Sequence, residues 1–182
     1  MLGIPSTSSV SLIVAKSNSG KSHLIRYILT QWAIKKEFDY CFVFANTKFN
    51  HGYDYIEDGF VYGGMTSDEL EGVIKKIVRK QLEVEKVRGK KPKAVLVFDD
   101  CMSYNFDSPF WRRIITEYRH YGLTLIFSVQ YLVKAVPTIF REQATHVIIF
   151  RTENYNSIDA LHKAFMLDIS RKEIYDFINI FP

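Results

Sequence analysis

The sequence predicts an α/β fold: a three-layer sandwich whose mainly parallel central sheet carries helices on both faces. Short runs of apolar, often β-branched residues recur along the chain, and segments with apolar residues at helical spacing separate them. Strands that are apolar throughout are typical of a parallel sheet covered on both faces by crossover helices. No repeat or low-complexity tract interrupts this alternation, so we expect one domain over residues 1–182, with a core at about 9–150 and C-terminal helices at about 155–180.

The composition is that of an ordinary globular protein. The chain has 182 residues, a length sufficient to bury a core. Its content of 47% hydrophobic and 24% charged residues is typical of such proteins. Two cysteines, Cys41 and Cys101, are too few for a disulfide framework and match no metal-ligand spacing. No apolar run approaches the roughly 18 residues that span a bilayer, and the first residues lack a signal-peptide pattern. We therefore expect an intracellular protein that does not enter a membrane.

The first third of the chain predicts two strands with a helix between them. Ser9–Ala15 and Tyr40–Ala45 are apolar runs of strand length. From Lys21 onward, apolar residues repeat at helical spacing and form one buried stripe. This stripe consists of Leu24, Ile25, Ile28, Leu29 and Trp32. Residues 46–59 are polar and turn-rich and predict a loop, and a short strand at Phe60–Tyr62 follows it.

Capping signals mark two helices in the middle of the chain. Thr66 and Glu69 have the spacing of a capping box and open a helix with one apolar side. Ser108 followed by Pro109 predicts another helix, which we expect to run to about Tyr121. Its core-facing residues are expected to be Phe110, Ile114, Ile115 and Tyr118.

Three further apolar runs and two short helices complete the prediction. The predicted strands are Ala94–Phe98, Leu123–Val129 and Thr145–Phe150. Two helices close the chain, and a capping box at Ser170–Glu173 opens the second of them.

The segment AKSNSGKS leaves the first strand and enters a helix, at the sheet edge where parallel folds bind ligands. This context and the Gly-Lys-Ser ending are typical of the phosphate loop of P-loop NTPases. Gly20 would let the backbone approach the β-phosphate, Lys21 would reach the β- and γ-oxygens, and Ser22 would hold Mg²⁺. The predicted nucleotide-binding residues are Ala15, Lys16, Ser17, Asn18, Ser19, Gly20, Lys21 and Ser22.

Two positions of this loop carry open questions. Ala15 stands where the consensus has glycine, and alanine is tolerable there if φ is negative. Lys16 adds a second positive charge at the entry of the loop. Its side chain either touches phosphate or faces solvent.

Two carboxylates follow the strand in AVLVFDD and are expected at the same sheet edge as the phosphate loop. Asp99 would join the Mg²⁺ ligands, and Asp100 would orient or deprotonate the attacking water. A helix cap or a turn is the alternative for paired acids. The phosphate loop favours the catalytic interpretation, because the two features are expected together.

Polar residues around the next strand are candidates for sensing the nucleotide. Gln130 ends that strand, where its amide could sense the γ-phosphate or position water. Arg112 and Arg119 are expected on the exposed side of the preceding helix. Such arginines either lie on a solvated surface or act as arginine fingers on a neighbouring subunit's nucleotide.

With these elements placed, the chain resembles the viral DNA-packaging ATPases of the FtsK–HerA superfamily, above all the poxvirus type. The resemblance runs from about Ser9 to Phe150. Its most specific part is Arg-His-Tyr-Gly at 119–122 leading into a strand, Gln130 at the end of that strand, and Val-Pro-Thr-Ile-Phe-Arg at 136–141.

The resemblance implies a RecA-like ATPase core that uses ATP and Mg²⁺ and drives double-stranded DNA into a capsid. It implies a homo-oligomeric ring, pentamer or hexamer, capsid or portal-vertex proteins as partners, and work in the host cytoplasm or at the viral assembly site. The residues that match the family's motif positions are Lys21, Ser22, Asp99, Asp100 and Gln130. Arg119 is the expected finger in trans and Arg141 the alternative, and Asp100 stands where members of the superfamily often have glutamate.

Basic residues concentrate between Lys75 and Lys93, where nine Lys or Arg face two Glu, a local charge of +7 in a chain of net +4. This surface is either a solvated helix face or a site for a polyanion. The DNA-contact candidates within it are Lys86, Arg88, Lys90, Lys91 and Lys93. The loop Met102–Ser108, directly after the acidic pair, is the other candidate for gripping DNA.

Two other functions fit the same motifs. A nucleotide-dependent switch or assembly protein would bind ATP without turnover. A P-loop nucleotide kinase is the less favoured alternative, because no compact arginine-rich lid is evident.

Overall fold

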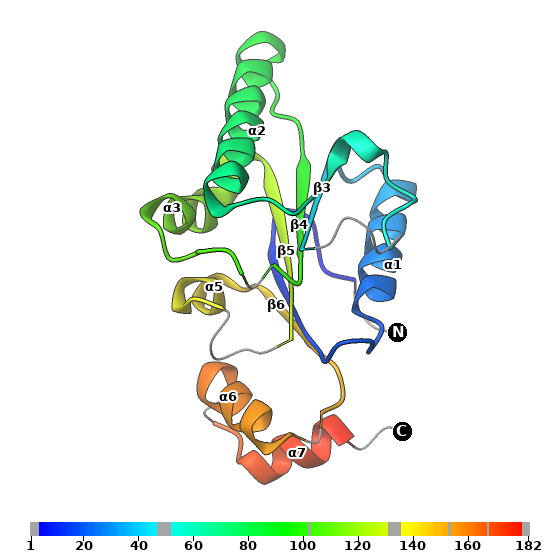
Figure 1. The fold of residues 1–182 in the computed structure, drawn as a ribbon, viewed down its shortest axis with the longest axis vertical. Helices are drawn as coiled ribbons and strands as arrows, with labels where there is room; N and C mark the ends of the chain where they lie inside the picture. The colour runs from blue at the N-terminus through cyan, green and yellow to red at the C-terminus, as the bar shows by residue number, and fades with distance from the viewer. Residues whose placement is uncertain are drawn as a thin grey trace.

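A computed structural model of the chain describes residues 4–46, 52–101, 103–130, 136–152, 154–166 and 168–179. Within these residues, six strands form one sheet in the order β3-β2-β4-β5-β1-β6, and every neighbouring pair is parallel (Figure 1). The strands are β1 (Val10–Val14), β2 (Tyr40–Ala45), β3 (Val61–Gly63), β4 (Ala94–Asp99), β5 (Leu123–Val129) and β6 (His146–Ile149). The predicted α/β fold is confirmed, and the sheet is fully parallel.

Helices cover both faces of the sheet, with α1 on one side and α2 and α3 on the other (Figure 1). The helices are α1 (Lys21–Ile34), α2 (Ser67–Arg88), α3 (Pro109–Glu117), α5 (Thr138–Gln143), α6 (Tyr155–Phe165) and α7 (Arg171–Asn179). Successive strand residues alternate between two cores: Ile13 and Val97 pack with α1, and Leu12 and Phe98 pack with α2 and α3. This alternation explains why the central strands are apolar at every position.

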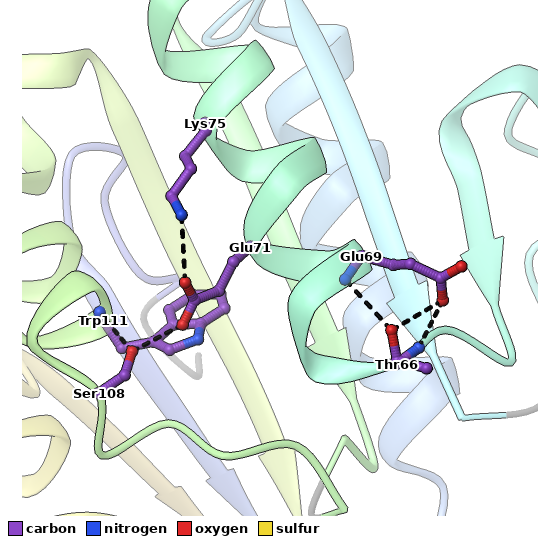
Figure 2. Close-up of polar contacts among 6 residues, drawn as sticks. All are labelled: Thr66, Glu69, Glu71, Lys75, Ser108 and Trp111. Atoms are coloured by element: carbon purple, nitrogen blue, oxygen red, sulfur yellow. Dashed lines mark hydrogen bonds and ion pairs between the residues drawn. The ribbon is translucent and has the colours of Figure 1, made fainter.

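Side-chain caps fix the start of α2 and tie it to α3 (Figure 2). Thr66 Oγ1 accepts from Glu69 N at 3.3 Å, and Glu69 Oε2 accepts from Thr66 N at 2.7 Å, which is the predicted capping box. Ser108 caps α3, and its hydroxyl also donates to Glu71 Oε1 of α2 at 2.7 Å. Lys75 contacts the other oxygen of Glu71 at 3.3 Å. The two helices are thus joined by polar contacts as well as by their shared core.

The C-terminal helices α6 and α7 lie beyond the end of β6 (Figure 1). The predicted capping box at Ser170 and Glu173 is present, with hydrogen bonds of 2.9 and 3.3 Å. Ala160 and Leu161 of α6 reach the same core as α2 and α3. Among the described residues, no helix is both long and apolar enough to cross a membrane.

Three local predictions differ from the structure. The helix after Ser108 is α-helical only to Glu117, and Tyr118–Tyr121 is a 3₁₀-helix. A 3₁₀-helix places residues three apart on the same side, and Tyr118 and Tyr121 are both buried. Trp111 is fully buried, whereas the predicted core residue Phe110 is only partly buried. The short strand β3 begins one residue later than predicted, at Val61.

Candidate active site

The segment from Ala15 to Ser22 follows β1 at the carboxyl edge of the sheet. Two residues of this loop, Asn18 and Gly20, have positive φ, at 57° and 94°. Left-handed residues within such a turn direct successive N–H groups toward one concavity, which suits an anion. A Cβ at Gly20 would have room, since its nearest neighbour would be Phe150 at an ordinary 3.9 Å. Glycine is therefore required here by its positive φ and not by lack of space.

Ala15 fits its position without strain. Its φ is not positive, its side chain is buried, and its N–H donates to the carbonyl of Val129 at 3.1 Å. A small residue is therefore sufficient at this strand exit, and the φ of Ala15 meets the requirement for alanine stated from the sequence. The departure from glycine does not disturb the loop.

The N-terminus of α1 is left open for a ligand. Gly20 provides no side-chain cap, and the first turn contains no acidic residue. The other described helices of nine residues or more are capped by side chains, those of Thr66, Ser108, Asn154 and Ser170. The first N–H groups of a helix lack partners within it and favour negative charge, so α1 offers its free donors to a phosphate.

Lys21 is buried, with 8% of its surface exposed. Its ammonium donates to the carbonyl oxygens of Ala15 and Lys16 at 3.0 and 2.9 Å. These bonds hold the charge within the curve of the loop. A buried ammonium beside open helix N–H groups is a strong point of attraction for a polyphosphate.

Asp99 lies at the end of β4 and contacts Ser22 of α1 at the carboxyl edge of the sheet. Its Oδ2 accepts hydrogen bonds from the Ser22 hydroxyl at 3.2 Å and from the Tyr53 hydroxyl at 2.8 Å. Burial, followed by the charge of Asp99, raises the pKa of Tyr53 far above its ordinary value. The phenol therefore stays protonated and acts as a donor to the carboxylate.

Asp100 and Gln130 meet across the ends of β4 and β5. Gln130 Nε2 donates to Asp100 Oδ2 at 2.5 Å, and the N–H of Asp100 donates to the carbonyl of Ser128 at 3.0 Å. Asp100 has a φ of 54°, a left-handed conformation that aspartate tolerates better than most residues. This turn separates the directions of the two adjacent carboxylates.

A cavity of about 780 Å³ opens beside these groups. It is lined by Ser17, Asn18, Gly20, Lys21, Ser22, His23, Ala45, Asn46, Gly52, Tyr53, Asp54, Asp58, Val61, Asp99 and Asp100. The hydroxyl of Ser22 and the carboxylate of Asp99 are hard oxygen donors that suit Mg²⁺. Within the described residues no cluster of three or more His, Cys, Asp or Glu could hold a metal alone. Mg²⁺ usually takes one or two protein oxygens together with substrate phosphates and water.

Comparison with protein families decides the relationship of the chain. A family model described as Poxvirus A32 protein matches residues 9–182. The chain belongs to this family. It is also 28% identical over 169 residues to the uncharacterized protein 075L of Invertebrate iridescent virus 6, and the match covers 90% of this chain and 62% of that protein. The chain thus spans less than two thirds of that relative's length.

Solved structures share the fold of this A32-family chain. The genome packaging NTPase B204 of Sulfolobus turreted icosahedral virus 2, in complex with ATP-gammaS, matches with a TM-score of 0.68 and 22% identity. That match covers 91% of this chain and 85% of B204. The cytoplasmic domain of the type VII secretion ATPase EccC of Thermomonospora curvata matches with a TM-score of 0.58 and 14% identity, over 88% of this chain and 23% of EccC. At 22% and 14% identity, these structural matches show that the chain shares the fold of the two proteins and nothing more.

Neither of the two candidate arginine fingers of this A32-family chain lines its own cavity. Arg119 is at the amino end of β5, and its guanidinium stacks on Tyr118 at 5.3 Å and donates to that residue's hydroxyl. The length of β5, roughly 20 Å at about 3.3 Å per residue, separates it from the phosphate loop. Arg141, on α5, is half-buried and donates to Thr138 at 2.9 Å. The exposed Arg112 pairs with Asp107 at 3.9 Å.

The basic turn at Lys86–Lys93, which connects the end of α2 to β4, lies at the amino end of β4, at the sheet edge opposite the cavity. The side chains of Lys86, Arg88, Lys90 and Lys93 are exposed. Lys91 differs from them, because its ammonium pairs with Glu85 at 3.1 Å and donates to the carbonyl of His120. Lys91 therefore has a structural partner on each side, which the sequence did not indicate. Lys16, the charge at the loop entry, has an exposed side chain that does not line the cavity.

The loop after the acidic pair is anchored in the core. Cys101, Tyr104 and Phe106 are buried, and Phe106 packs edge-on against Trp111 at 4.7 Å. Burial raises the pKa of the Cys101 thiol, which lies 3.1 Å from the carbonyl of Phe44. Met102, part of the predicted DNA-gripping loop, lies outside the described residues.

Sequence reasoning missed the wall of the cavity that residues 52–61 form. Tyr53, Asp54 and Asp58 line the cavity although the segment was predicted only as a loop. His23 and Asn46 were likewise not singled out. The available signal was the cluster of aromatic residues within a polar loop, because several large apolar side chains close together are informative where a single exposed one is not.

Proposed function

We propose that this chain is the ATP-hydrolysing part of a motor that moves double-stranded DNA into a viral capsid. Membership of the Poxvirus A32 protein family supports this proposal. So does the fold shared with a protein described as a genome packaging NTPase. The observation that carries it is the meeting of five groups at one sheet edge: Lys21, Ser22, Asp99, Asp100 and Gln130.

The arrangement of these side chains suits hydrolysis of the γ-phosphate of ATP. Lys21 and the open N-terminus of α1 would bind the β- and γ-phosphates. Ser22 and Asp99 would hold Mg²⁺, which when bound neutralises phosphate charge and polarises the bond to be broken. Asp100 would accept a proton from the attacking water. Gln130 donates to Asp100 through its amide nitrogen, which leaves its carbonyl oxygen to orient that water.

A ring of subunits is part of the proposal. Arg119 is too far from its own cavity to contact the nucleotide there, so a role as finger requires a neighbouring subunit. Arg141 is the alternative donor. Capsid or portal-vertex proteins would be the partners of the ring, and the host cytoplasm or the viral assembly site its location.

The test is phosphate release from Mg²⁺-ATP with and without duplex DNA at low salt. Wild-type protein should hydrolyse ATP faster with DNA, and Lys21→Ala should abolish release, because the buried ammonium is lost from the phosphate loop. Lys35→Ala, at the exposed C-terminal end of the same helix, is the matched control and should behave as wild type.

Light scattering with an ATP analogue and duplex DNA should show a nucleotide-dependent oligomer. An intact oligomer without DNA stimulation would refute the motor. Tight ATP binding without turnover would instead support a nucleotide-dependent switch. Transfer of phosphate to a nucleoside would indicate a kinase.

A further inference from the structure

Tyr53 belongs to neither the phosphate loop nor the acidic pair, yet it contacts Asp99 at the end of β4. Its hydroxyl donates to Asp99 Oδ2 at 2.8 Å, and Ser22 donates to the same oxygen at 3.2 Å. We propose that Tyr53 is a positioning residue, which holds the Asp99 carboxylate in the orientation that Mg²⁺ requires. This inference rests on the proposed function, because it assigns a role within the same nucleotide site.

A carboxylate at the end of a strand needs an external partner to fix its direction. Asp99 is only partly buried, so packing alone does not select one orientation of its side chain. The Ser22 hydroxyl is itself a proposed Mg²⁺ ligand and cannot be a constant reference. Tyr53 is different, because its oxygen has no other proposed role. Partners of this kind orient metal ligands, and their loss typically lowers metal affinity about 10–100-fold.

The tyrosine ring is rigidly supported. Tyr53 is 9% exposed and packs in the core that α1 covers. Its ring lies 6.0 Å from that of Tyr55, and the guanidinium of Arg26 lies over Tyr55 at 5.0 Å. Arg26 is one helical turn after Ser22 on α1. The segment at 53–55 therefore connects the acid on β4 with the helix that carries the phosphate loop.

Tyr53→Phe removes the hydroxyl and keeps the ring. The measurement is the affinity for the slowly hydrolysed analogue ATPγS as a function of Mg²⁺ concentration, with a second titration in EDTA. We expect the Mg²⁺ midpoint of the variant to rise about 10–100-fold. Binding in EDTA and the melting temperature without ligand should remain those of the wild type.

Tyr55→Phe is the matched control. The Tyr55 hydroxyl is buried and has no hydrogen-bond partner in the described part of the chain, so its removal should leave the Mg²⁺ midpoint unchanged. A double-mutant cycle separates positioning from packing. In an Asp99→Asn background, Tyr53→Phe should have no further effect on the Mg²⁺ midpoint, since the group it positions is already altered.

Each outcome decides the inference. An unchanged Mg²⁺ midpoint in Tyr53→Phe would overturn it, as would a lower melting temperature with normal Mg²⁺ dependence. A full effect of Tyr53→Phe in the Asp99→Asn background would also overturn it. If wild-type protein does not bind ATPγS with Mg²⁺, the proposed function itself fails. Normal wild-type binding with an unaffected variant refutes the role of Tyr53 alone.

Discussion

Replacement of Asp100 by glutamate should impair ATP hydrolysis. We expect this although members of the FtsK–HerA superfamily, which the sequence resembles, often have glutamate at this position. The reason lies in the backbone. Asp100 has a φ of 54°, and its carboxylate is held by Gln130 at 2.5 Å. Aspartate adopts this φ more readily than glutamate, and the 2.5 Å contact with Gln130 is made by the shorter aspartate side chain.

Two magnitudes follow from that geometry. The left-handed conformation costs an ordinary residue about 1–2 kcal/mol, and aspartate less, so glutamate should lower the free energy of unfolding by about 1 kcal/mol. The extra methylene moves the carboxyl group by about 1.5 Å, the length of one carbon–carbon bond. A misplacement of about 1 Å can cost about 100-fold in rate. We therefore expect kcat of Asp100→Glu to fall about 100-fold, equivalent to about 2.7 kcal/mol.

The assay is phosphate release at saturating Mg²⁺-ATP with duplex DNA, alongside thermal unfolding. Asp100→Asn provides the comparison, because asparagine tolerates the left-handed turn but cannot accept the proton. It should keep the wild-type melting temperature and lose about 10²–10⁴-fold in kcat. An Asp100→Glu variant with wild-type kcat and wild-type stability would show that neither the turn nor the carboxylate distance governs this position.

Two further predictions concern stability. Gly122→Ala should destabilise by about 2–4 kcal/mol in denaturant unfolding, because φ is +65° and the new Cβ would lie 2.6 Å from the carbonyl of Pro92. Gly89→Ala, with φ of +66° and open space, should lose only the backbone part, and equal losses would exclude the clash. Thr66→Ala should cost about 1 kcal/mol, or about 2–4 °C in melting temperature. The Thr66 N–H and then its hydroxyl lower the pKa of Glu69. Thr66→Ala removes only the hydroxyl, whose part of this stabilisation exists above the ordinary pKa of 4.5 and disappears as pH falls through the lowered pKa. A difference between wild type and variant that grew at acid pH would contradict this.

The fold was predictable because local and global signals agree. Each strand of the sheet is a short apolar run, and the capping boxes at Thr66 and Ser170 mark helix starts that the structure confirms. The end of α3 was not predictable from periodicity. Tyr118 and Tyr121 are both buried in the 3₁₀-helix that follows α3, and helical spacing alone does not distinguish the two geometries there.

The phosphate loop and the acidic pair were predictable because the carboxyl ends of all strands in a parallel sheet lie at one edge, although β5 separates β1 from β4. The contact between Ser22 and Asp99 follows from that rule. Tyr53 was not predictable, because it comes from an irregular segment with no periodic pattern. The left-handed turn at Asp100 was also hidden, since a residue's type permits such a φ without requiring it.

The proposed ring offers a link between the basic turn and ATP hydrolysis in a neighbouring subunit. In its own subunit this turn is at the edge opposite the nucleotide, which argues against a link between hydrolysis and DNA contact. Yet Lys91 donates to the carbonyl of His120, directly after Arg119, and Gln81 donates to the carbonyls of Pro92 and Tyr121 at 3.0 and 3.3 Å. If Arg119 serves the neighbour's nucleotide, the basic turn is bonded to the segment that senses that nucleotide. Hydrolysis in the neighbouring subunit could then change the position of Arg119. The hydrogen bonds made by Lys91 and Gln81 would transmit that movement to the exposed lysines of the basic turn.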